Sequence, residues 1–96
     1  MTEIKRLVLD VLKPHTPSII ELAKRLGKAE GVMGVNCTLA EVDQETESIK
    51  ITVVGQNISY EAVEKTIRAC GAVIHSVDSV SSGKTLVDEV ETPQDR

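Results

Sequence analysis

Four segments of the chain alternate apolar and polar residues with the period of two that is typical of half-buried β-strands. Two segments between them repeat apolar residues at helical spacing. The predicted strands are residues 4–13, 32–43, 48–55 and 72–81. The predicted helices run from residue 17 to about Gly27 or Glu30, and from residue 59 to about residue 70. The pattern therefore predicts the element order β-α-β-β-α-β.

The ends of the predicted helices carry capping signals. The first helix has two possible starts: Thr16 as the cap with Pro17 in the first helical position, or Ser18 as the cap with Glu21 completing a capping box. Ser59 is the expected cap of the second helix, and Gly71 follows its end. The polar stretch 43–47 is predicted to be the turn of a hairpin.

This element order is the split form of β-α-β, in which right-handed crossovers place both helices on one face of an antiparallel sheet. The fold class is therefore α+β, a ferredoxin-like plait with four strands in the order 4-1-3-2. With 96 residues, there is room for one domain only. We expect this domain to span residues 1–86, and residues 87–96, which are acidic and contain a proline, to form a flexible tail.

One face of such a sheet has no helical cover. Leu7, Val35, Ile51 and Val77 are expected to point toward the helices, and His75 shares the parity of Val77, so it should lie beneath the end of the second helix. Half of the residues predicted for the open face are apolar. They are Arg6, Val8, Asp10, Leu12, Asn36, Thr38, Ala40, Val42, Lys50, Thr52, Val54, Ile74, Ser76, Asp78 and Val80.

An apolar patch of this kind on a small protein favours a protein interface over solvent exposure. The expected partner is a second copy of the chain, bound through the open face or through an edge strand, which makes the protein a homo-oligomer. The expected register also sets Arg6 opposite Asp78 and Asp10 opposite Lys50, as cross-strand ion pairs.

Composition excludes several classes of protein. The net charge is −4 and Tyr60 is the only aromatic residue, so aromatic platforms for stacking bases are absent and nucleic-acid binding is disfavoured. No apolar run approaches the roughly 18 residues that a membrane span needs, and no secretory leader pattern follows Met1, so we expect a cytoplasmic protein. Cys37 and Cys70 are far apart and suit buried small hydrophobic positions.

The topology gathers charged and titratable residues at one end of the domain. They are Asp10, Lys13, His15, Glu41, Asp43, Glu45, Glu47 and His75. The four carboxylates around the hairpin tip, from Glu41 to Glu47, are the oxygen ligands that calcium and magnesium prefer, and Asp10 and Asp78 are a further candidate pair. The alternative is a solvated acidic turn, unless two subunits share the site.

Catalytic chemistry has two candidate groups, His15 and His75. Neither has a nucleophile at a suitable spacing, and Ser76, His75 and Asp78 do not form a triad because neighbours on a strand point to opposite faces. The sequence thus indicates a binding or structural module rather than an enzyme.

Three long stretches carry a family resemblance. They are LVLDVLKPHTPSIIELA, GVMGVNCTLAEVDQETESIKITVVG and GAVIHSVDSVSSGKTLVDE, and together they resemble the archaeal Domain-of-Unknown-Function 211 family over nearly the whole chain. The resemblance implies a ferredoxin-like plait that assembles into oligomers. The family has no established activity, so the resemblance assigns no role to any residue.

Two other resemblances supply alternative functions. LDVLKP and HSVD are similar to segments of the exchange-factor domain of elongation factor one beta, which implies action on a GTPase. The chain is also similar to ACT-type regulatory plaits, which bind small ligands between paired domains. In that case Lys13, Pro14 and His15 would occupy the position of the ligand loop.

Overall fold

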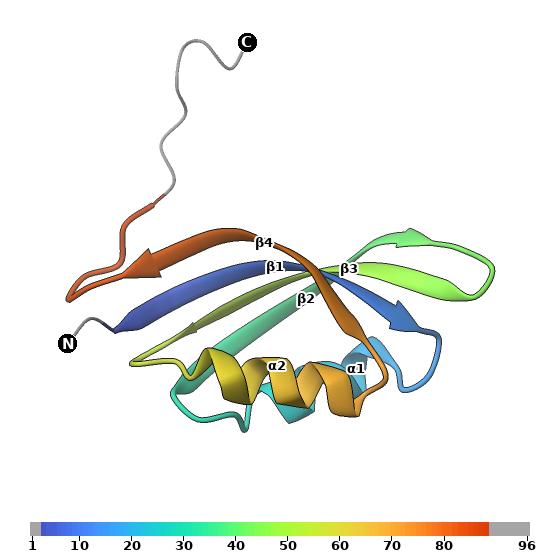
Figure 1. The fold of residues 1–96 in the computed structure, drawn as a ribbon, viewed down its shortest axis with the longest axis horizontal. Coiled ribbons are helices and arrows are strands. Elements are labelled where there is room, and N and C mark those ends of the chain that lie inside the picture. The colour runs from blue at the N-terminus through green and yellow to red at the C-terminus, as the bar shows by residue number, and fades with distance from the viewer. Residues whose placement is uncertain (1–2, 89–96) are drawn as a thin grey trace, which may run out of the picture.

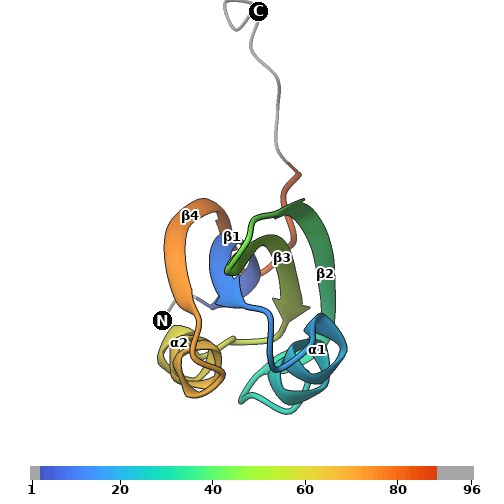
Figure 2. The ribbon, with the colours of Figure 1, turned by 90° about the vertical axis from the view of Figure 1, so that its right-hand side faces the viewer.

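The computed structural model describes residues 3–88. Its elements are β1 (Ile4–Pro14), α1 (Ile19–Leu26), β2 (Val32–Val42), β3 (Thr46–Gly55), α2 (Tyr60–Ala69) and β4 (Val73–Ser82). The strands form one antiparallel sheet in the order β2-β3-β1-β4, which is the predicted order read from the other edge. Both helices lie on one face of the sheet (Figure 1), with α2 beneath the β4 edge and α1 beneath the β2 edge (Figure 2).

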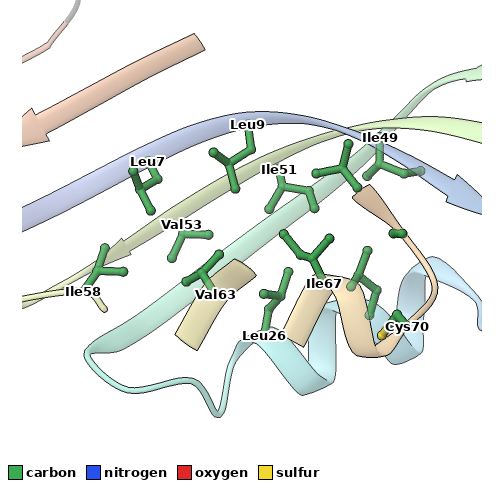
Figure 3. Close-up of a cluster of buried hydrophobic side chains, with 13 residues drawn as sticks. Leu7, Leu9, Leu26, Ile49, Ile51, Val53, Ile58, Val63, Ile67 and Cys70 are labelled. Atoms are coloured by element: carbon green, nitrogen blue, oxygen red, sulfur yellow. The ribbon is translucent and has the colours of Figure 1, made fainter. Parts of the chain in front are cut away.

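The core between the sheet and the helices is built from aliphatic side chains (Figure 3). Inward-facing residues of β1 and β3 meet one stripe of each helix, as the two periodicities predict. The aliphatic residues at 1% exposure or less are Leu7, Leu9, Val11, Leu22, Leu26, Ile49, Ile51, Val53, Val63 and Ile67. Burial of each contributes about 1.5–3 kcal/mol relative to exposure, so this layer drives folding.

Both helix caps are serines. Ser18 Oγ accepts a hydrogen bond from the Glu21 amide at 3.2 Å, which makes Ser18 the cap of α1 and leaves Pro17 outside the helix. Ser59 Oγ accepts from the Ala62 amide at 3.1 Å and caps α2 as predicted. Of the two starts that the sequence allowed for the first helix, the Ser18 start is therefore the one adopted.

The predicted faces of β4 are wrong over much of the strand. Register shifts in the β1–β4 ladder place Ile74 opposite Val11 and Val80 opposite Leu7, on the helix side rather than on the open face. His75 is exposed and lines a hollow with Asp10, instead of lying beneath α2. The physical reason is that each β-bulge adds one residue to the strand and reverses the alternation beyond it.

A bulge in β2 makes the predicted face of Val42 wrong. The register shifts between Leu39 and Glu41, so Val42 lies opposite Glu47, which in turn lies opposite Lys13 on the helix side of the sheet. Val42 therefore leaves the open face, and it is 57% exposed.

The register of one of the two expected cross-strand pairs is confirmed, although its residues do not form an ion pair with each other. Asp10 lies opposite Lys50, but Arg6 lies opposite Ser81 rather than Asp78. Asp78 instead accepts a hydrogen bond from Ser76 at 2.7 Å, and its Oδ2 lies 3.7 Å from Lys50 Nζ. The bulges in β4 again account for the difference, because they displace Asp78 along β1.

Two glycines allow a close backbone approach where β3 ends. Gly31, with φ at +84°, accepts a hydrogen bond from the Gln56 amide at 3.0 Å. A Cβ on Gly55 would lie 2.0 Å from the carbonyl oxygen of Gly31. Position 55 therefore has no space for a side chain unless the backbone moves.

We expect Gly55→Ala to lower the free energy of unfolding by about 2 kcal/mol or more, since overpacking against backbone forces a rearrangement. Urea denaturation measures this effect. Gly27→Ala is the matched control, because Gly27 has helical φ and a Cβ there would sit 3.5 Å from its nearest neighbour. Equal unfolding midpoints for the two variants would contradict the close-approach argument.

Candidate functional site

A buried lysine anchors the most organised polar cluster of the described residues. Lys13 continues the inward-facing series of β1 after Leu7, Leu9 and Val11, so its side chain enters the interior and is 0% exposed. The cluster lies where β1 ends, beside the tip of the β2–β3 hairpin. We call Lys13, His15 and Glu47 the clasp.

Four oxygens surround the ammonium group of Lys13. Nζ donates to the carbonyl of Pro14 at 2.7 Å and to the carbonyl of Pro17, with the carbonyl of His15 at 3.4 Å. Glu47 Oε1 lies 3.0 Å from the same nitrogen, an ion pair that lacks hydrogen-bond geometry. Because a buried ammonium is costly without such partners, these contacts hold the connection from β1 to α1 against the hairpin.

His15 closes the clasp from the solvent side. Its Nδ1 lies 3.0 Å from Glu47 Oε2 and its Nε2 lies 3.0 Å from the carbonyl oxygen of Gln44. Both partners are acceptors, whereas a neutral imidazole carries only one N–H. Only the imidazolium form donates to both, so the geometry favours a protonated ring.

The electrostatics of the pair agree with this geometry. The hydrogen bond to Glu47 and, after it, the carbonyl of Gln44 raise the pKa of His15 above its usual 6.5. The same hydrogen bond, together with Lys13, lowers the pKa of Glu47 below its usual 4.5. Chemically, the clasp is therefore an ion network that ties the connection between β1 and α1 to the hairpin in a pH-dependent way.

The sequence placed these three residues at one end of the domain but did not pair them. The signal for Lys13 was present in its parity, because a polar residue that continues a buried series must find partners inside. The signal for Glu47 was hidden, because the strand was expected to begin at Ser48, whereas β3 begins at Thr46 and sets Glu47 opposite Lys13.

The predicted metal ligands do not converge within one copy. Glu41, Asp43 and Glu45 are exposed near the hairpin tip, while Glu47 turns inward to the clasp. Asp10 and Asp78 lie on the open face, as described above. Within residues 3–88, no three His, Cys, Asp or Glu side chains form a group that could hold a metal ion.

The cysteines are packing residues, as expected. Cys70 is buried in the core, and Cys37 is half-buried against it. Burial raises the pKa of the Cys37 thiol to about 11, so the thiol stays protonated at neutral pH.

Neither of the two helices in the described part of the chain is long and apolar enough to cross a membrane.

The clasp should make the folded state less stable as pH rises. A raised His15 pKa adds stability that is complete below the unfolded value of 6.5 and is lost as pH rises through the folded pKa. We expect the melting temperature to fall between pH 6 and pH 9 in the wild type and to fall less in His15→Gln, as measured by circular dichroism.

The control for this experiment is His75→Gln, because His75 lies on the open face, away from the helix-side position of Lys13. Its melting profile should keep the wild-type slope. A His15→Gln profile parallel to that of the wild type would show that the clasp carries no pH-dependent stability.

Comparison with known proteins agrees with the resemblance seen in the sequence. Residues 5–96 match the model of the DUF211 family, described as uncharacterized ArCR. The chain is also 45% identical over 96 residues to "Uncharacterized protein MJ0319" of Methanocaldococcus jannaschii, a match that covers 100% of this chain and 99% of that protein. The chain therefore belongs to the DUF211 family, whose description assigns no activity.

Proposed function

We propose that this protein is a small self-assembling binding module, in which copies associate through aliphatic residues on the two edges of the sheet. The observation that carries the proposal is the exposure of apolar side chains on the helix side of both edge strands. Val77 and Val80 of β4 are 45% and 52% exposed, and Leu39 and Val42 of β2 are 45% and 57% exposed.

These residues face the helix side of the sheet, but none of them belongs to the buried core. Val77 and Val80 lie opposite Leu9 and Leu7 of β1, on the face that α2 and α1 pack against. They sit on the outermost strand and outside the buried core, although α2 lies beneath that edge of the sheet (Figure 2). Apolar residues on an uncovered strip beside a packed core favour contact with another protein surface.

Bulges at the edges influence how a second copy would attach. Both edge strands contain register shifts, which interrupt the row of free backbone groups and disfavour simple continuation of the sheet. Contact through side chains is therefore the favoured mode. Because the two strips differ in sequence, they suit a head-to-tail contact, with the β4 edge of one copy on the β2 edge of the next.

A divalent cation forms a second part of the proposal. Glu41, Asp43 and Glu45 are exposed near the β2 edge, close in sequence to Val42, and each copy needs to supply only part of a shared coordination shell. The lack of a metal-holding group within residues 3–88 of one copy directs this hypothesis to the contact between copies.

Substitution at the β4 edge tests the association. We expect the mass of the full chain in solution, measured by light scattering after size exclusion, to exceed that of one copy. The double variant Val77→Lys/Val80→Lys should reduce it to one copy, because two buried, unpaired ammonium groups oppose the contact. Val73→Lys is the matched control, since Val73 is 54% exposed on the same strand but lies on the open face.

A wild type with the mass of one copy would refute the proposal, and dissociation of Val73→Lys would refute the choice of surface.

The same mass measurement, made in chelator and in millimolar calcium, tests whether a cation takes part. We expect calcium to increase the mass or the melting temperature of the wild type and to leave Asp43→Asn/Glu45→Gln unchanged. An identical response of both proteins would exclude the hairpin carboxylates as ligands.

A further inference from the structure

The chain turns back over the open face after β4. Residues 83–88, which we call the strap, lie on the side of the sheet opposite the helices (Figures 1 and 2). The turn begins at Gly83, whose φ of +122° is rarely adopted by other residues, and the Gly83 amide donates to the carbonyl of Glu3 at 2.7 Å.

Three contacts fix the strap to the face. Ser81 Oγ donates to the carbonyl of Val87 at 2.9 Å, and Arg6 Nη2 lies 3.0 Å from Asp88 Oδ1. The side chain of Leu86 lines a hollow together with Met33 and Val54. The strap therefore reaches from the outer strand across β1 toward β3 and β2.

The strap accounts for burial that the sheet alone does not explain. Ser81 lies opposite Arg6 on the open face, yet it is only 7% exposed, and the Arg6 side chain is 21% exposed. The last two residues of the strap, Val87 and Asp88, are the first two of the predicted tail 87–96, and both contact the sheet. Residues 89–96 lie outside the described residues.

The contacts that hold the strap are individually weak. The Asp88 side chain is 89% exposed, and ion pairs in such positions contribute about 0–1 kcal/mol. Leu86 and Val87 remain about half exposed, and none of the strap residues belongs to the core. The strap can thus be released without unfolding the domain.

We propose that the strap is an autoinhibitory cover, and that a second copy packs on the open face when the strap is released. Release uncovers apolar surface at Val54, which is half-buried and lines the hollow beside Leu86. This surface is separate from the edge strips of the proposed function. The inference depends on that function only in assigning another copy of the chain as the partner.

Charge complementarity supports a second copy as the occupant. The open face carries two cations, Arg6 and Lys50, and two carboxylates, Asp10 and Asp78. While the strap is in place, Asp88 neutralises Arg6. Once the strap leaves, Arg6 lacks that partner, and a copy related by two-fold symmetry can offer a carboxylate to it in a face-to-face sheet packing.

Two shortened chains, one without the strap and one with it, test the proposal. A chain ending at Gly83 lacks the strap, whereas a chain ending at Asp88 keeps it and lacks only residues 89–96. Both are made in the Val77→Lys/Val80→Lys background, so that association through the edges does not contribute. We expect the mass of the chain ending at Gly83 to double at micromolar concentration, and that of the chain ending at Asp88 to stay at one copy.

Equal masses for the two truncations would overturn the strap proposal, whether or not the edges of the full chain associate. If the chain ending at Gly83 does not fold, charge reversal gives the same test in the full-length background. In the Val77→Lys/Val80→Lys chain, Asp88→Arg should shift the mass upward, and adding Arg6→Glu should restore one copy by re-forming the pair with reversed charges. A double variant that keeps the raised mass of Asp88→Arg would contradict the strap proposal.

Discussion

The inward alternation of β1 is the constraint on which the rest of this structure depends. β1 is a central strand, paired to β3 on one side and to β4 on the other, and every second residue from Leu7 to Lys13 points toward the helices. The first three of these side chains anchor the aliphatic core. The fourth is a lysine, and its burial forces the polar groups at that end of the domain to organise around it.

This constraint explains how much the sequence could predict. Element order, strand order and the serine cap of α2 follow from periodicity and capping, and they are confirmed. The faces of the edge strands could not be predicted, because a bulge leaves no distinctive residue in the sequence and reverses every assignment beyond it. His75 and Val80 were misplaced for this reason, whereas no residue of β1 was.

The clasp shows the same limit on a smaller scale. Four acidic residues alternate through the hairpin, and the length of the turn decides which of them faces Lys13. A turn of five residues would leave Glu47 in the loop, whereas the observed turn, closed by a 2.8 Å hydrogen bond from the Asp43 amide to the Thr46 carbonyl, places it in β3. The end of the domain was therefore predictable from the sequence, but the residue that pairs with the lysine was not.

The energetics of association limit what the edge strips can form. Completing the burial of a half-exposed valine or leucine contributes on the order of 1 kcal/mol, so the four strip residues supply about 4 kcal/mol, near the lower end of the roughly 4–15 kcal/mol that association costs. A single open contact is therefore weak. In a closed ring each copy buries both strips, and the last contact forms without a further loss of translational freedom. If copies associate as proposed, closure is the arrangement in which two modest strips give a stable assembly, and it leaves the strapped face free.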